Sequence, residues 1–242
     1  MRYLGGKTRL AKDISGAMLA ATSDRSRFID PFVGGGSIMN AMVPHFAETY
    51  ISDIHLDLVM LYQKIADEGI DWIPEEVSEE TWRSFRKTEP SALRGFVGFG
   101  CSFGGRWFEG YARGGNTNYA AQSKRSLAKH LETWQQVTEV SCKSYVDIKV
   151  QKGDIIYLDP PYVNTKSYSG TDRFDTDEFW DNARAWAAEG AHVFVSEYKA
   201  PDGWTSIWSK EKKVTMDSLY TASSIEKERE VKKDIEHLFT IL

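Results

Sequence analysis

Residues 155–162 have the sequence Ile-Ile-Tyr-Leu-Asp-Pro-Pro-Tyr, and this stretch decides the fold. Its four leading apolar residues predict a short buried strand. Two consecutive prolines cannot continue a central strand, so they end it in a fixed, extended turn. In an α/β sheet, ligands bind beyond the carboxyl ends of the strands, where this turn falls. The turn therefore presents a carboxylate, a backbone carbonyl and an aromatic ring to a ligand. The simpler alternative is a strand end whose Asp159 caps a loop.

Strands and helices alternate on both sides of this stretch. The pattern is typical of a parallel sheet with helices on its faces, so the predicted fold class is α/β. The expected elements are a helix at 10–21, a strand at 27–30, a helix at 37–46, a strand at 49–53, a helix through 61, a strand at 154–158, a helix at 177–189, a strand at 192–196 and a last strand at 234–242.

The middle of the chain has a different character. Between residues 65 and 149 strand signals become sparse, and glycine mixes with aromatic and basic residues. We interpret this part as a mostly helical insert that divides the sheet domain into residues 1–64 and 150–242. A helical insert needs apolar anchors, and we expect these to be core residues. They are Trp82, Phe85, Phe96, Phe99 and Trp134.

Composition excludes several protein classes. The chain has 242 residues, of which 41% are hydrophobic and 27% charged, as in ordinary globular proteins. No apolar run is long enough to cross a bilayer, and the N-terminal residues lack the apolar core of a signal peptide. Two cysteines cannot form a disulfide framework, and five scattered histidines give no metal-ligand pattern. We therefore expect a cytoplasmic protein without a membrane segment or a metal.

The charge distribution indicates a possible nucleic-acid surface. The net charge is −5, yet residues 82–130 hold nine Lys or Arg residues against two acids. An acidic body with a basic middle segment is compatible with DNA binding through that segment alone. A solvated basic helix face is the alternative that the charge pattern leaves open.

The turn at 159–162 suits the activation of an aromatic amine. The lone pair of the N6 amine of adenine is delocalised into the ring, so the amine is a poor nucleophile. The Asp159 carboxylate and the Pro160 carbonyl can accept hydrogen bonds from its two N–H groups, which localises the lone pair. Asp159 then stabilises the positive charge that develops on the nitrogen during methyl transfer, and Tyr162 offers a face for stacking. Such an amine cannot be reached inside a duplex, so base flipping is implied.

Two further signals indicate a nucleotide-like cofactor. Residues 30–37, Asp-Pro-Phe-Val-Gly-Gly-Gly-Ser, form a glycine turn between a strand and a helix, where a backbone can approach a ligand closely. The glycine spacing does not match a dinucleotide fingerprint, which argues against a dehydrogenase. Asp53 ends the next strand and can accept hydrogen bonds from ribose hydroxyls. Taken alone, Asp53 is also a common type of helix N-cap.

The N-terminal residues carry a fourth signal. Gly6-Lys7-Thr8 suggests a P-loop, but no strand precedes it and the first glycine of that motif would have to be Met1. Lys7 can instead pair with a small carboxylate, such as the methionyl end of a cofactor. A basic terminus without a binding role fits the spacing equally well.

Together these motifs resemble the Dam-type adenine-N6 DNA methyltransferases, especially their phage-borne members. The motifs that carry the resemblance are Tyr-Leu-Gly-Gly-Lys at 3–7, the glycine turn at 30–37, the acid at 53, a variable insert, and Asp-Pro-Pro-Tyr at 159–162. The resemblance spans nearly the whole chain. It implies a seven-stranded, mostly parallel Rossmann-like sheet with one antiparallel strand near the C-terminus, and a target-recognition role for the insert.

The resemblance also implies roles for individual residues. S-adenosyl-L-methionine is the expected cofactor, and Asp159, Pro160 and Tyr162 are expected to bind and activate a flipped adenine. Asp53 is expected to hold the cofactor ribose. The residues expected to line the rest of the cofactor site are Tyr3, Lys7, Asp30, Phe32, Gly34, Gly36 and Asp159.

Double-stranded DNA is the expected partner of a monomer or weak dimer. Five basic residues of the insert are candidates for phosphate contacts: Arg106, Arg113, Lys124, Arg125 and Lys129. Arg106 and Arg113 are also candidates for reading a guanine. Two positions depart from the family pattern: Asp30 stands where many relatives carry Glu, and Glu197 replaces the usual Asn after Ser196. The insert lacks the recognition hairpin of GATC-specific members.

Two alternatives stay open at this stage. The first keeps the methyl-transfer chemistry but changes the substrate to cytosine N4, RNA or a protein glutamine. Such enzymes usually carry Ser or Asn in place of Asp159. The second is an inactive, DNA-binding relative, for which an intact cofactor pocket with Asp53 and Tyr162 would have no use.

Overall fold

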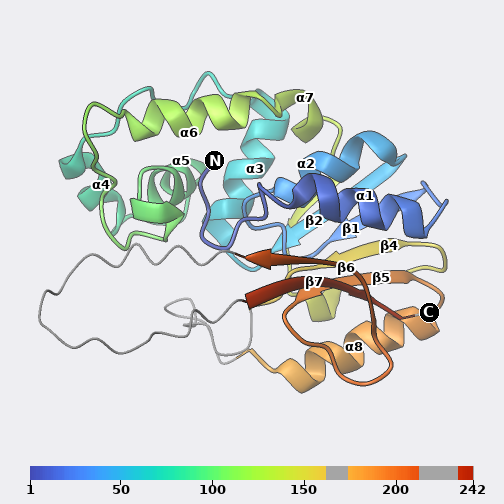
Figure 1. Cartoon of the computed structure of the whole chain (residues 1–242). Coiled ribbons are helices and arrows are strands. Elements are labelled where there is room, and N and C mark those ends of the chain that lie inside the picture. The colour runs from blue at the N-terminus through green and yellow to red at the C-terminus, as the bar shows by residue number, and fades with distance from the viewer. Residues whose placement is uncertain (162–173, 213–233, 242) are drawn as a thin grey trace, which may run out of the picture.

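A seven-stranded sheet forms the centre of the molecule (Figure 1). The computed structural model describes residues 1–161, 174–212 and 234–241. The sheet order is β3-β2-β1-β4-β5-β7-β6, with parallel pairing from β3 to β5 and with β7 antiparallel to both of its neighbours. This topology confirms the predicted α/β fold with one antiparallel strand near the C-terminus. The strands are β1 (Arg27–Asp30), β2 (Glu48–Asp53), β3 (Glu139–Cys142), β4 (Ile155–Leu158), β5 (His192–Glu197), β6 (Thr205–Lys212) and β7 (Asp234–Thr240).

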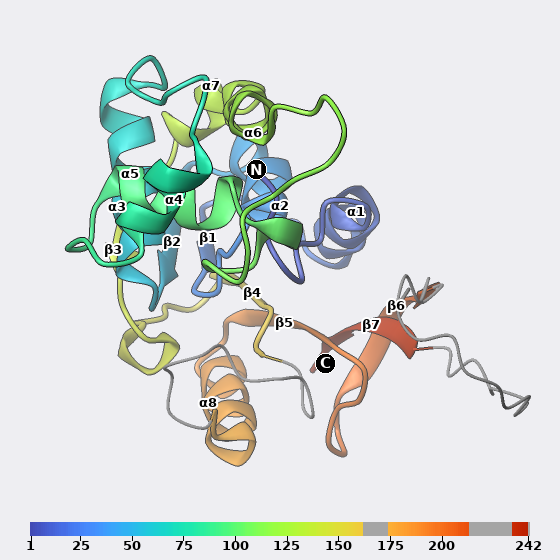
Figure 2. The same ribbon diagram turned by 90° about the vertical axis from the view of Figure 1, so that its left-hand side faces the viewer.

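Helices cover both faces of the sheet (Figures 1 and 2). On one face lie α1 (Ala11–Ala21), α2 (Ser37–Met42) and α3 (Leu56–Glu68), and on the other lies α8 (Thr176–Ala188). Alternation along β4 supplies both layers, as it must when side chains alternate across a strand. Ile155 and Tyr157 pack beneath α1 and α2, and Ile156 and Leu158 pack against α8. All four side chains are buried, which explains the unbroken apolar run in the sequence.

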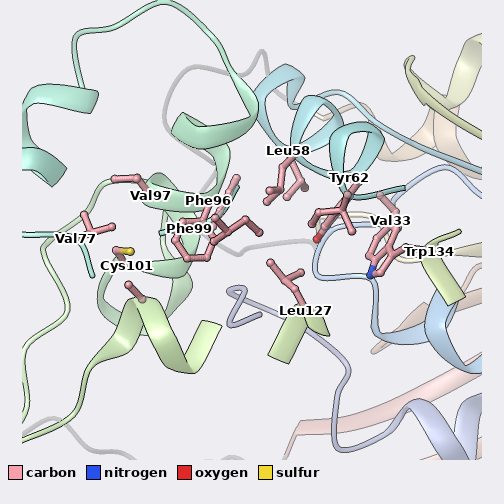
Figure 3. Close-up of a cluster of buried hydrophobic side chains, with 14 of the residues drawn as sticks. Val33, Leu58, Tyr62, Val77, Phe96, Val97, Phe99, Cys101, Leu127 and Trp134 are labelled. Atoms are coloured by element: carbon pink, nitrogen blue, oxygen red, sulfur yellow. The ribbon is translucent and has the colours of Figure 1, made fainter. Parts of the chain in front are cut away.

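The helical region between α3 and β3 packs over α3. It consists of α4 (Glu79–Phe85), α5 (Ala92–Gly95), a π-helical turn η2 (Phe96–Gly100), a 3₁₀ turn η3 (Phe103–Gly105), α6 (Tyr119–Ala128) and α7 (Leu131–Trp134). One hydrophobic cluster runs from Val33 and Leu58 in the sheet domain to Phe99 and Trp134 in the helical region (Figure 3). The helical region therefore shares its core with the sheet domain. The expected anchors are buried, except that Phe85 is half-buried.

Two edge strands are absent from the sequence-based expectations. β3 lies within the interval 65–149, and β6 follows the strand at 192–197. Both are polar edge strands, so they lack the apolar alternation on which such a prediction depends: β3 is Glu-Val-Ser-Cys, and β6 begins Thr-Ser and ends Ser-Lys-Glu-Lys. The helix expected at 37–46 ends at Met42, and Pro44 lies in the 3₁₀ turn η1 (Val43–His45) that follows.

Candidate active site

Three aspartates lie at the carboxyl ends of neighbouring strands. Asp53 ends β2, Asp30 ends β1 and Asp159 follows β4, and these strands are adjacent in the sheet. Asp30 is 1% exposed. Burial raises its pKa well above the usual range, and the negative charges of Asp159 and Asp53 act in the same direction. Because both neighbours act on the Asp30 carboxyl, the three acids form one anionic edge of the sheet.

Backbone N–H groups of the glycine turn hold two of these carboxylates. Asp30 Oδ1 accepts a hydrogen bond from the Phe32 N–H at 3.2 Å. Asp53 accepts hydrogen bonds from the Gly34 N–H at 3.1 Å and from the His55 N–H at 2.9 Å. Burial raises the pKa of Asp53, while the two N–H donors act against that shift. The turn thus fixes both side chains, and a carboxylate oxygen with one donor keeps a lone pair for a ligand.

The glycines of this turn also permit close packing within the chain. Gly34 and Gly36 have φ angles of 44° and 72°, which favour glycine. A Cβ at Gly34 would lie 3.0 Å from the Tyr3 ring, and a Cβ at Gly36 would lie 2.8 Å from the Trp134 ring. The Gly34 carbonyl accepts a hydrogen bond of 2.6 Å from Tyr62, whose ring stacks on Trp134 at 4.1 Å. The turn is therefore shaped both by the N-terminal segment, residues 1–10, and by the helical region.

Lys7 reaches the anionic edge from the N-terminal segment. Its ammonium lies 2.6 and 2.8 Å from the two carboxylate oxygens of Asp159. It also lies 3.6 Å from Oε1 of Glu236, a fully buried residue of β7. The carboxylate partner expected for Lys7 from the sequence was that of the cofactor, whereas in the structure Lys7 contacts Asp159 and Glu236. Glu236 was missed because a single acid within a short strand carries no recognisable pattern.

The remaining predicted site residues divide between described and undescribed parts of the chain. Asp159 is 19% exposed and Pro160 is buried. Tyr162 lies outside the described residues. Phe32 is half-buried and stacks on Tyr145 at 5.4 Å, and the rings of Phe174 and Phe179 meet it edge-on. The aromatic partners of Phe32 come from η4 (Tyr145–Asp147), from α8 and from Phe174, two residues before α8 begins, so sequence spacing could not reveal them.

A basic groove adjoins Lys7. It has a volume of about 1400 Å³ and lies between the N-terminal segment, α6 and β6. Its lining contains Glu211 as the one acid found in the described parts of the chain. Arg2 lies in the wall with its guanidinium 4.1 Å from the centre of the Tyr119 ring. The basic residues that line the groove are Arg2, Lys7, Arg9, Arg125, Lys129 and Lys210.

Comparison with known proteins identifies the family. The family model of the D12 class N6 adenine-specific DNA methyltransferases matches residues 3–91 and 108–232. The chain belongs to this family. It is therefore an adenine-specific DNA methyltransferase, which confirms the resemblance and the class of enzyme predicted from the motifs. The matched residues of this D12 class enzyme include all three aspartates of the anionic edge.

A curated relative agrees with this membership. The D12 class chain is 26% identical over 243 residues to the retron Ec67 DNA adenine methylase of Escherichia coli, covering 91% of this chain and 79% of the relative. Two solved structures are also similar, each 13% identical. A Haemophilus influenzae protein described as a methylase covers 98% of this chain and 99% of its own, with a TM-score of 0.37. An Escherichia coli protein described as a methyltransferase covers 96% and 86%, with a TM-score of 0.34.

Of the five predicted DNA contacts of this D12 class enzyme, two line the groove and three pair with acids. Arg125 and Lys129 line the groove. Lys124 forms an ion pair with Glu75 at 2.9 Å, and Arg106 lies 3.5 Å from Glu109. Arg113 pairs with Glu79, and the hydrogen bonds from Arg113 and Arg83 lower the pKa of Glu79 to about 2. The groove residues Arg2, Arg9 and Lys210 were missed because they come from distant parts of the chain.

The described parts of the chain contain neither a metal-ligand cluster nor a membrane-spanning helix. Within residues 1–161, 174–212 and 234–241, no group of three or more His, Cys, Asp or Glu side chains is arranged to hold a metal ion. No helix in the same ranges of this D12 class enzyme has the length and apolarity to span a bilayer.

Proposed function

We propose that this enzyme transfers a methyl group from S-adenosyl-L-methionine to the N6 amine of an adenine flipped out of double-stranded DNA. The observation that carries this proposal is the anionic edge formed by Asp53, Asp30 and Asp159. Carboxyl groups on adjacent strand ends, with Lys7 paired to Asp159, suit a cationic ligand and a reaction that develops positive charge.

The proposed cofactor site lies at the glycine turn. S-adenosyl-L-methionine supplies an electrophilic methyl group on a positively charged sulfur, and the anionic edge fits that charge. Asp53 would accept hydrogen bonds from the ribose hydroxyls with the lone pairs left by its two N–H donors. The half-buried ring of Phe32 would form an apolar wall. The other proposed lining residues are Tyr3, Asp30, Gly34 and Gly36. Lys7 contacts two carboxylates of the chain itself, so we assign its role to Asp159.

The proposed adenine site lies at the turn after β4. Asp159 and the Pro160 carbonyl would accept hydrogen bonds from the amine, which localises its lone pair. Asp159 would then face the positive charge on the methylated nitrogen. Pro160 is buried and follows a fully buried strand, so its carbonyl belongs to a rigid part of the chain. Tyr162 is proposed as the surface on which the extruded base stacks.

The proposed DNA path follows the basic groove. Phosphates are bound mainly by Lys and Arg, and the groove gathers such residues from three separate elements. Lys7 belongs both to the groove lining and to the Asp159 contact. A base leaving a duplex in the groove would therefore have a short route to Asp159. Arg125 and Lys129 are the predicted contacts that this path retains. Arg106, Arg113 and Lys124 would lie at its margin.

A product analysis tests the proposal. Double-stranded DNA is incubated with the enzyme and methyl-labelled S-adenosyl-L-methionine, then digested to nucleosides. We expect the label in N6-methyladenine, at defined sequence positions, and its loss in an Asp159→Ala control. Label in N4-methylcytosine, or labelling of RNA or protein in preference to DNA, would replace this substrate assignment.

A further inference from the structure

Glu236 is a buried acid outside the residues that the family model matches. It lies in β7, paired in register with Lys210 of β6, and it is 0% exposed. Its neighbour two residues along the strand, Leu238, packs beneath α1 and α2, so both side chains share that face of the sheet. A carboxylate in such a position requires a partner, because an unpaired buried charge is strongly destabilising.

Lys7 is such a partner, and it lies closer to Asp159 than to Glu236. Its ammonium is at hydrogen-bond distance from both oxygens of Asp159, at 2.6 and 2.8 Å, but 3.6 Å from Glu236. The Lys7 carbonyl accepts the N–H groups of Leu10 and Ala11 at 2.8 Å, which fixes its main chain at the start of α1. The side chain can therefore adjust while the backbone stays in place. A movement of about 1 Å or less would bring the ammonium into hydrogen-bond range of Glu236.

The reaction requires such an adjustment. In the proposed function, Asp159 accepts a hydrogen bond from the substrate amine and faces its developing positive charge. An ammonium held on both Asp159 oxygens opposes each of these tasks. Glu236 gives the Lys7 ammonium a second carboxylate to bind, so that one Asp159 oxygen can accept a hydrogen bond from the amine.

We propose that Glu236 is a positioning residue that receives the Lys7 ammonium when the substrate amine occupies Asp159. This inference rests on the proposed function and adds a component to its site. Lys7 and Glu236 form and break no covalent bond in this step. Their part is to keep the ammonium paired and buried while one Asp159 oxygen becomes available to the amine.

The first test is Glu236→Gln in the full-length enzyme, assayed for methyl transfer to DNA. The amide keeps the shape of the side chain but not its charge, so Lys7 should remain on Asp159. We expect kcat to fall roughly tenfold or more with little change in KM for either substrate, because the lost interaction acts in the transition state. Glu236→Asp keeps the charge at a greater distance from Lys7 and should give an intermediate kcat. The matched control is Glu139→Gln, since Glu139 of β3 also pairs with a lysine, Lys143 at 2.8 Å, but at the surface.

A double-mutant cycle with Lys7→Met separates positioning from general structural support. Without the ammonium, Glu236→Gln should lower kcat no further, so the two effects should be non-additive. Equal losses with and without Lys7 would overturn the inference, as would a wild-type kcat for Glu236→Gln. If Glu236→Gln does not fold, Glu236→Asp decides: a lower kcat at constant KM supports the inference and a wild-type kcat overturns it. A wild-type enzyme that transfers no methyl group to DNA would instead refute the proposed function.

Discussion

The anionic edge and the helical region differ in how their ionisable side chains are placed. At the edge, Asp30 and Asp53 are buried and fixed by backbone N–H groups, and each has a raised pKa. In the helical region, Arg113 and Lys124 pair with acids at or near the surface. Exposed ion pairs contribute little to stability, and they divert basic side chains from other partners. Carboxyl groups whose charged form is disfavoured by burial therefore mark the proposed site more reliably than charge that is merely abundant.

The largest expected effect is that of Asp159→Ala. This change removes the carboxylate that we propose to face the developing positive charge, and we expect kcat to fall by about a hundredfold to a thousandfold. Binding of S-adenosyl-L-methionine should change little, because the proposed contacts with the cofactor come mainly from the glycine turn. Turnover and calorimetric cofactor binding measure the two parts. Retention of most activity would remove the proposed mechanism.

The contact between the two regions is tested by Gly36→Ala. The backbone there is left-handed, and a new Cβ would lie 2.8 Å from the Trp134 ring. We expect the free energy of unfolding to fall by about 2–4 kcal/mol, from backbone strain together with overpacking. Gly104→Ala is the matched control, since Gly104 has a similar φ of 63° but a Cβ added there would meet no atom within 4 Å. It should lose only about 1 kcal/mol. Equal losses in urea unfolding would show that the Trp134 contact is unimportant.

The sequence predicted the sheet edge better than the helical region for a physical reason. Parallel strands bring their carboxyl ends together whatever their side chains are, so placing Asp30, Asp53 and Asp159 on successive strands sufficed to place them on one edge. A basic residue on a helix has no such constraint. Whether Arg113 faces DNA or Glu79 depends on a fold that brings together residues 34 positions apart. Glu236 was out of reach for the same reason.

The groove is tested by two charge-removing double variants. Arg125→Gln with Lys129→Gln should weaken DNA binding and lower the slope of log Kd against log salt by roughly 2, since two proposed phosphate contacts are removed. Arg113→Gln with Lys124→Gln removes the same number of charges from residues that already stand beside acids. We expect a smaller change in both quantities. Titrations of labelled duplex at several salt concentrations measure them. Equal effects of the two double variants would move the DNA path beyond the groove.

The smallest expected effect concerns the pH dependence of stability at the sheet edge. Burial raises the pKa of Asp30, so the folded state binds this proton more tightly than the unfolded state does. In the window from the unfolded pKa of about 4 up to the raised folded pKa, stability therefore decreases as the pH rises. Below that window the carboxyl is protonated in both states and its charge has no effect.

Asp30→Asn removes the titration while keeping an oxygen that can accept the Phe32 N–H. Urea unfolding of both proteins across pH should show the variant gaining stability relative to the wild type as pH rises through the window. The gain should then stay constant above it. Asp53 also has a raised pKa, and its charge acts on Asp30, so the difference between the two curves reports the titration of Asp30 together with its coupling to Asp53. A difference that stays constant from low to high pH would mean that Asp30 has the same pKa in the folded and unfolded states, and that burial at this edge has less effect than the geometry implies.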